Sequence, residues 1–367
     1  MQLLCEDPAT APHDGGVLVI DDTGDRKDGS ATAHVARQYL GSVGKIDNGI
    51  VAVTSLWADE RCYWPVHAVP YTPASRLPAG ERDPGFRTKP QLAIELVQAA
   101  QQAGIRFQAV VADCAYGDNP GFTDALGAAN VPFVLALKPR RGTWAPADAA
   151  HTPTEAAEEL GWRSPTRPGR WRRITRRFRD GHTETWWAAD AQLGGWGPDR
   201  RLRLVVATTD PASLPGHSSW YLLTNLPRPA SSRAQQANLA EVVRLYGLRN
   251  WVEQGYKQVK GELGWADFQV RSDRAIRRHW TLVCCAFSFC WQAFLAEQPA
   301  APQSQVAAPA AARGATAAGH PRRTRRREFM AGGVASGAGL ADPMERAATL
   351  LAGVVASAAA PAAATAA

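Results

Sequence analysis

The chain lacks the residue patterns that identify disulfide frameworks and zinc sites. Its 367 residues include six scattered cysteines without a C-x-x-C spacing, and eight histidines without an H-E-x-x-H sequence. We therefore expect reduced thiols rather than disulfides or zinc ligands. The N-terminus does not resemble a signal peptide, and no apolar run is expected to be long enough to span a bilayer. These absences predict a soluble, cytoplasmic protein that does not bind a membrane.

Basic residues outnumber acidic ones. Lysine and arginine total 41 against 34 aspartates and glutamates, so the formal net charge is +7 at pH 7. This balance favours a polyanionic partner such as nucleic acid, although an arginine-rich proteome would produce the same excess. Hydrophobic residues make up 45% of the chain, which is enough for a sizeable core.

The hydrophobic pattern predicts an α/β fold. The first three apolar runs indicate an antiparallel meander, and helices then alternate with strands. Strands are expected within 17–22, 49–59, 61–71, 107–117 and 131–139, and helices over 89–104 and 119–130. Residues 162–179 are dense in arginine and contain no acid, and they belong to a segment with further expected strands.

Changes in composition predict five parts of the chain. The C-terminal part is rich in alanine and proline, and we expect it to be largely disordered. The parts are a short lead (1–14), the first part of a core (15–140), a β-rich insertion (141–235), a helical completion of the core (236–297) and a tail (298–367).

Carboxylates stand at the ends of two predicted strands and on one late helix. Asp21 and Asp22 close the first strand, and Asp113 closes the fourth. The segment 246–264 reads as one helix whose face carries Glu253 among basic side chains, and a solvated salt-bridge ladder would give the same spacing. If the two strands are neighbours, the acids converge and the helix brings Glu253 beside them.

Three clustered carboxylates repel one another unless a divalent cation neutralises them. Oxygen-only ligands favour Mg²⁺ or Mn²⁺ over zinc, and two such ions are suited to in-line phosphoryl transfer. The basic residues Arg249, Lys257 and Lys260 would then hold a nucleic-acid backbone. The sequence therefore predicts a metal-dependent reaction on DNA.

The spacing Tyr246-x-x-Arg249-x-x-x-Glu253, followed after six further residues by Lys260, resembles the Y-R-E-K signature of DDE insertion-sequence transposases. The stretches "VIDDTGDRKDG", "VVADCAYGDNPGF" and "KGELGWADFQVRS" resemble other blocks of the insertion sequence 701 family, which is related to the insertion sequence 4 group. The resemblance covers about residues 15–296. It implies a ribonuclease-H-like mixed sheet flanked by helices, with a β-rich insertion between the second Asp and the Glu.

The resemblance also implies an activity and its residues. The activity is DNA transposition, in which the element ends are nicked by hydrolysis and the freed 3′-OH is transferred to a target. The catalytic, metal-binding triad would be Asp21, Asp113 and Glu253, with Asp22 as the alternative to Asp21. The DNA-binding residues would be Tyr246, Arg249, Lys257 and Lys260. Stacking on an unpaired base, or packing in the core, is the role expected of Trp162, Trp171, Trp186, Trp187 and Trp196.

Two readings of the function remain open. The partners implied are the terminal inverted repeats and target DNA, bound by a homodimer in the cytoplasm at the nucleoid. Only about twenty residues precede Asp21, so we expect the N-terminal DNA-binding domain of the family to be missing. The alternative to an active transposase is therefore a catalytically silent remnant that only binds DNA.

Overall fold

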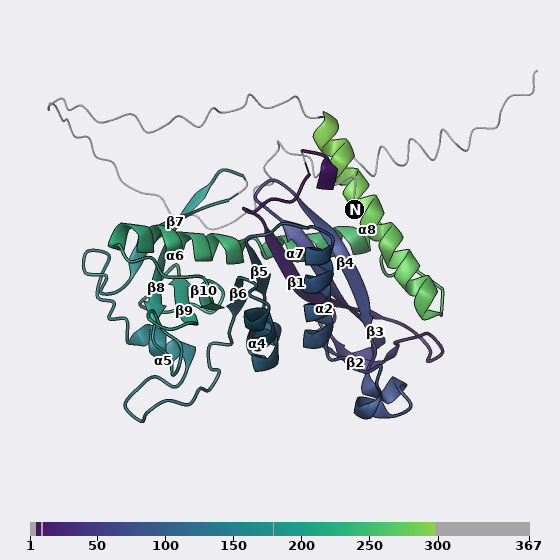
Figure 1. The fold of residues 1–367 in the computed structure, drawn as a ribbon, viewed down its shortest axis with the longest axis horizontal. Helices are drawn as coiled ribbons and strands as arrows, with labels where there is room; N and C mark the ends of the chain where they lie inside the picture. The colour runs from purple at the N-terminus through teal and green to yellow at the C-terminus, as the bar shows by residue number, and fades with distance from the viewer. Residues whose placement is uncertain (1–4, 9, 179, 298–367) are drawn as a thin grey trace, which may run out of the picture. The chain divides into compact units, whose positions relative to one another are not determined.

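The protein is described here by a computed structural model, which covers residues 5–8, 10–178 and 180–297 (Figure 1). The described residues up to 292 form one compact unit. The predicted tail, 298–367, lies outside the described residues, so its predicted disorder stays a prediction.

One mixed sheet runs through the unit, and its described strands number ten. They are β1 (Val17–Arg26), β2 (Ala36–Leu40), β3 (Lys45–Ala58), β4 (Tyr63–Tyr71), β5 (Ala109–Ala112), β6 (Phe133–Ala136), β7 (Arg172–Arg177), β8 (Thr183–Ala191), β9 (Arg203–Thr208) and β10 (Ser219–Thr224). The order is β2-β3-β1-β5-β6-β10-β9-β8-β7, with β4 also paired to β3. The pairs β1–β5 and β5–β6 are parallel, and the others are antiparallel.

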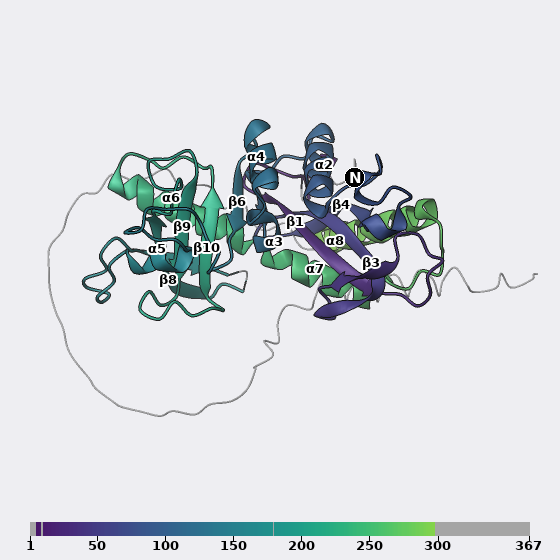
Figure 2. The ribbon, with the colours of Figure 1, turned by 90° about the horizontal axis from the view of Figure 1, so that it is seen from below.

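Helices cover both faces of the central strands. The described helices are α2 (Lys89–Gln102), α3 (Cys114–Gly117), α4 (Pro120–Ala128), α5 (Pro153–Glu158), α6 (Ser232–Gly247), α7 (Asn250–Gly261) and α8 (Asp273–Glu297), with short 3₁₀ turns η1 (Ala74–Arg76) and η2 (Gly80–Arg82). Helices α2 and α4 lie on one face of β1 and β5, and α6 and α7 lie on the other (Figures 1 and 2). The α/β class predicted from the sequence is therefore confirmed.

The predicted meander is present, with one strand that the sequence did not reveal. Strand β3 pairs antiparallel with both β1 and β4, as the three apolar runs indicated. The additional strand is β2, which pairs with the first residues of β3. Its sequence, ARQYL, alternates between half-buried and exposed positions before it ends at the buried Leu40, so it carries no apolar run that would mark a strand.

The expectation of one continuous helix over 246–264 is wrong. Helix α6 ends at Gly247, and α7 begins at Asn250 with Arg249 as its N-cap residue. The backbone tightens between them, since the Arg249 amide donates to the Tyr246 carbonyl at 3.0 Å. Tyr246 and Arg249 therefore lie on either side of a helix junction, and Glu253 lies in the first turn of α7.

The C-terminal helix requires a second correction. Residues 273–296 are long and apolar enough to cross a membrane by length and composition alone, contrary to the expectation from the sequence. One face of α8 is buried, including Ile276, Trp280 and Phe287 at 0–1% exposure, as expected of a core helix. Leu282, on the opposite face, is 70% exposed.

Candidate active site

The sheet brings Asp21 and Asp113 to the same level. Ile20 of β1 pairs with Ala112 of β5, and the two strands are parallel. The residues that follow this pair, Asp21 and Asp113, therefore lie at the same level. Asp21 is 8% exposed within β1. Asp113 leaves β5 and caps α3, where its Oδ1 accepts a hydrogen bond from the Ala115 amide at 2.9 Å. The two acids therefore converge, but only Asp113 lies at the end of its strand, because β1 continues past Asp21 to Arg26.

Asp22 points away from this group. Successive side chains of a strand face opposite sides of the sheet, so the neighbouring acids separate. The Asp22 carboxylate lies 2.7 Å from the ammonium of Lys89, at the start of α2. Asp21 instead accepts a hydrogen bond from Arg249 Nη2 at 2.7 Å on the α7 side. Of the two alternatives, Asp21 is the one that shares a face with Asp113.

Arg249 lies among all three predicted acids. Its Nη2 is 2.7 Å from Asp21 Oδ2 and 3.9 Å from Asp113 Oδ2, and its Nη1 is 3.4 Å from Glu253 Oε1. The Arg249 side chain is 14% exposed, whereas that of Glu253 is 65% exposed. Residues far apart in sequence thus form one group of three carboxylates around a single guanidinium.

The donors of this group suit a hard divalent cation. Among the residues that the structure describes, no three histidine, cysteine, aspartate or glutamate side chains are close enough together to hold a metal ion, and the Arg249 guanidinium lies between the three acids. The donors are all carboxylate oxygens, which Mg²⁺ and Mn²⁺ prefer. Burial raises the pKa of Asp21 to about 7, the charge of Arg249 opposes this effect, and that of Asp113 adds to it.

The remaining predicted DNA-binding residues differ in their surroundings. The Tyr246 ring is half-buried and lies 5.0 Å from the Trp220 ring at an interplanar angle of 70°, and burial raises the pKa of its hydroxyl to about 12. Lys257 is exposed and forms no ion pair with a described residue. Lys260 faces β1, where its ammonium lies 2.7 Å from Asp25 Oδ1.

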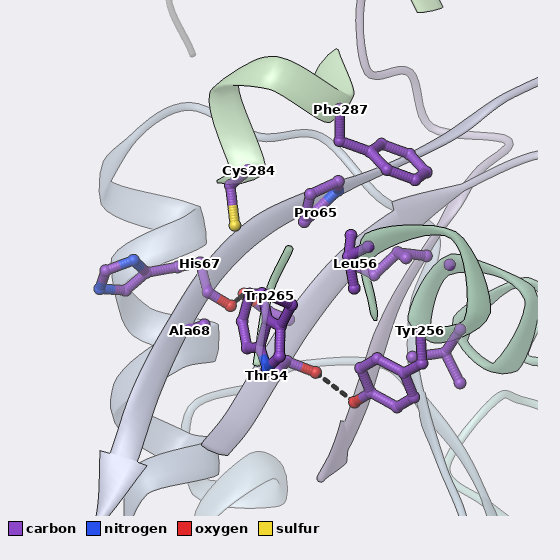
Figure 3. Close-up of a pocket in the computed structure, with 13 residues that line it drawn as sticks. Thr54, Leu56, Pro65, His67, Ala68, Tyr256, Trp265, Cys284 and Phe287 are labelled. Carbon is purple, nitrogen blue, oxygen red and sulfur yellow. Dashed lines mark hydrogen bonds between the residues drawn. The ribbon is translucent and has the colours of Figure 1, made fainter. Parts of the chain in front are cut away.

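Two hydroxyl groups hold α7 against β3 behind Asp21. The Tyr256 and Thr54 hydroxyl oxygens are 2.5 Å apart (Figure 3), and the Thr54 hydroxyl donates to the Asp21 carbonyl at 3.3 Å. Beside them a cavity of about 20 Å³ extends to Trp265 and Cys284. These contacts fix the α7 backbone one turn after Glu253.

An arginine that sequence reasoning did not select connects β7 to the helix junction. The Arg176 guanidinium lies 4.7, 4.6 and 4.5 Å from the ring centroids of Phe178, Trp186 and Trp220. Burial lowers the pKa of Arg176 to about 10. A Cβ atom at Gly247 would lie 2.8 Å from Arg176 Nη2, so the missing side chain permits this approach. The only sequence signal was a run rich in arginine and tryptophan.

Three of the five tryptophans considered for base stacking are core residues. Trp171, Trp186 and Trp187 are 1–8% exposed, and the Arg176 guanidinium lies over the Trp186 ring. Trp162 and Trp196 are half-buried, and Trp162 packs edge-on against Trp187 at 4.7 Å. For the three buried rings, the packing alternative is therefore the correct one.

The comparison with protein families identifies the class of this chain. Residues 2–196 match the family model described as DDE superfamily endonuclease, which is more than half of the chain. The chain therefore belongs to the DDE superfamily endonucleases. The matched range contains Asp21 and Asp113 and ends before Glu253.

The chain is also similar to a curated relative. The chain is 35% identical over 255 residues to the probable transposase for insertion sequence element IS701 of Microchaete diplosiphon, covering 69% of this chain and 60% of the relative. The chain thus spans about 60% of the length of that relative. Among solved structures, the NurA nuclease from Sulfolobus solfataricus aligns over 70% of this chain and 86% of its own, with 11% identity and a TM-score of 0.26, which is too low to support an argument.

Proposed function

We propose that the protein is an insertion-sequence transposase, which cleaves DNA at the element ends and transfers the strand in a metal-dependent reaction. The observation that carries this proposal is the group formed by Asp21, Asp113 and Glu253 around Arg249. Membership of the DDE superfamily endonucleases and the similarity to an IS701 transposase support it.

In this proposal Asp21, Asp113 and Glu253 hold Mg²⁺ or Mn²⁺, as two ions. The bound metal supplies activation of the attacking oxygen and neutralises charge on the leaving oxygen. Asp21 lies deepest, so it fixes one side of the metal site, whereas the exposed Glu253 closes the other side from α7. Asp22 is less well supported as a ligand because it pairs with Lys89 on the far face.

The basic residues near α7 bind and orient the DNA backbone. Lys257 is exposed and free to meet a phosphate, and Arg249 lies beside the reacting group. Tyr246 packs against Trp220 at the helix junction, and its hydroxyl is close enough to Arg249 and Asp113 for their charges to affect its pKa. Lys260 contributes indirectly, because its ion pair with Asp25 fixes the end of α7 on β1.

The proposed catalytic core is assembled from two segments of the chain. Residues 15–140 and 236–297 would form a ribonuclease-H-like core, with 141–235 as a β-rich insertion between Asp113 and Glu253. Strands β7 to β10 support it, since they fall between β6 and α6 in sequence and extend the sheet through the β10–β6 pair. Residues 1–14 would be a lead and 298–367 a tail.

The partners proposed are the terminal inverted repeats and target DNA, bound by a homodimer. The protein would act in the cytoplasm, at the nucleoid. The net charge of +7 supports an anionic partner. The alternative is a catalytically silent remnant, which would bind the same DNA without cutting it.

Nicking of the inverted repeats that flank the gene tests the proposal. Asp113→Asn keeps the N-cap of α3, because an asparagine oxygen also accepts the Ala115 amide, but it removes the charge. We expect metal-dependent nicking by the unmutated protein and a loss of roughly 10³-fold or more in Asp113→Asn, with DNA binding retained.

Asp118→Asn is the matched control, because Asp118 ends the same short helix and pairs with Lys138 and Arg141 outside the carboxylate group. It should retain nicking to within about threefold. Equal losses in both variants would contradict the assignment of Asp113. Binding without nicking by the unmutated protein would favour the silent remnant.

A further inference from the structure

We propose that Arg249 is an internal counter-cation of the three carboxylates, and that a divalent cation must displace its guanidinium in order to bind. This inference rests on the proposed function, in which Asp21, Asp113 and Glu253 hold the metal. It adds a competition between a side chain of the protein and the metal for the same oxygen atoms.

A single guanidinium forms ion pairs with all three acids. Within the described residues, no other lysine or arginine forms an ion pair with Asp21, Asp113 or Glu253, whereas Arg249 lies 2.7, 3.9 and 3.4 Å from their oxygens. Three carboxylates so close together would otherwise repel one another. Arg249 therefore supplies in the metal-free protein the neutralisation that a divalent cation would supply.

The position of Arg249 is compatible with release. Its Nε is buried and has no hydrogen-bond partner among the described residues, so the guanidinium is held through its Nη atoms alone. The residue is the N-cap of α7, next to the junction with α6. A change of side-chain rotamer would therefore remove the guanidinium without unwinding either helix.

A metal ion and the guanidinium cannot share these oxygens. An ion coordinated by Asp21 and Asp113 would place two positive charges against the guanidinium of Arg249, which already donates to Asp21 Oδ2. Once released, the side chain becomes available to a phosphate of the DNA backbone, a good bidentate acceptor for arginine. Metal loading and DNA binding would thus be linked through one residue, and the linkage would be reciprocal.

Binding of Mn²⁺ alone, followed by electron paramagnetic resonance of the free ion, tests the competition without an activity assay. Arg249→Lys keeps the charge, but its ammonium is a compact group that cannot span three carboxylates as the guanidinium does. Arg249→Gln removes the charge as well. We expect Mn²⁺ to bind Arg249→Gln about tenfold more tightly than the unmutated protein, and Arg249→Lys to have an intermediate affinity.

Two controls separate this effect from others. Lys257→Gln removes a charge from the same helix at a residue without an ion pair, and it should change the affinity by less than about twofold. Asp21→Asn removes a proposed ligand and should abolish binding in every background. Circular dichroism verifies the fold of each variant. If Arg249→Gln is unstable, Arg249→Lys, which retains the charge, still tests the displacement.

The outcomes distinguish this inference from the proposed function. Tighter binding in both Arg249 variants supports the competition, as does binding by Arg249→Gln when the unmutated protein binds none. Unchanged affinity in Arg249→Lys with a gain only in Arg249→Gln would indicate a general charge effect and overturn the displacement. Unchanged or weaker Mn²⁺ binding in both Arg249 variants, with loss of binding in Asp21→Asn, overturns this inference and leaves the proposed function in place. Absence of Mn²⁺ binding in every variant overturns the metal site itself.

Discussion

Replacing Arg203 with methionine is expected to destabilise the protein strongly, because this arginine is part of a buried ion pair. Arg203 of β9 is 2% exposed and lies 2.8 Å from Asp190 of β8, whose side chain is 7% exposed. Its Nη1 also donates to the Leu226 carbonyl at 2.9 Å and to the Asn238 amide oxygen at 2.8 Å. The side chain therefore connects β8 and β9 to α6, the helix that carries Tyr246.

The magnitude follows from what methionine leaves behind. Removing one partner of a buried ion pair costs about 3–5 kcal/mol, because the other charge remains buried without compensation. Arg228 still lies 3.3 Å from Asp190, so we expect a loss near the lower end, about 3 kcal/mol. Arg228 is 30% exposed, and Arg228→Met should cost about 1 kcal/mol or less.

Urea unfolding followed by tryptophan fluorescence measures these changes in the free energy of unfolding. The double variant Arg203→Met with Asp190→Leu removes both charges, so it should be more stable than Arg203→Met alone. If Arg203→Met were no more destabilising than Arg228→Met, or if the double variant were less stable than the single one, the reasoning from the buried charge would be refuted.

Three further predictions concern the two faces of β1, a buried histidine and the aromatic contacts of β7. Asp21→Asn should reduce nicking at least about 10³-fold, while Asp22→Asn should retain most of it; the reverse order in the nicking assay would select Asp22. Burial lowers the pKa of His34 below its usual 6.5 although Asp273 opposes this, so Asp273→Asn should lower it further in an NMR titration. Since the unfolded chain then binds the proton more tightly, the free energy of unfolding should fall as the pH decreases below 6.5, and a pKa above 6.5 would contradict this. Arg176→Lys should cost about 1 kcal/mol or more in urea unfolding, because an ammonium loses the planar contact with three rings, and wild-type stability would argue against that contact.

The sequence predicted the elements of the core sheet better than their ends. The apolar runs of β1, β3 and β5 are long or strongly β-branched, so their burial could be inferred from pattern alone. The alternation of side chains implied that Asp21 and Asp22 face opposite ways, but not which of them faces Asp113. That choice depends on the helices packed on each face, and the contact of Asp21 with Arg249 of the α7 side crosses more than 200 residues of sequence.

Other features of the site depend on tertiary contacts that leave little trace in the sequence. The helix break at Leu248 follows no proline, and Gly247 gave no sign that it faces a guanidinium from β7. Spacing placed Lys260 with the DNA-binding residues, whereas its ammonium pairs with Asp25. The position of Arg249 among the acids required both the sheet order and the helix junction.

Helix α7 is attached to β1 by two ion pairs, Arg249 with Asp21 and Lys260 with Asp25. Four residues of strand span about 13 Å, and eleven residues of helix rise about 16 Å, so the two elements are matched in length. Deleting either Asp21 or Asp22 would produce the same shortened sequence, and the remaining aspartate could align with only one of the two cations. The second aspartate therefore has a use that does not depend on its charge, because it sets the distance between the two attachment points. Related sequences should accordingly show other residues at the position of Asp22 more often than a deletion of that position.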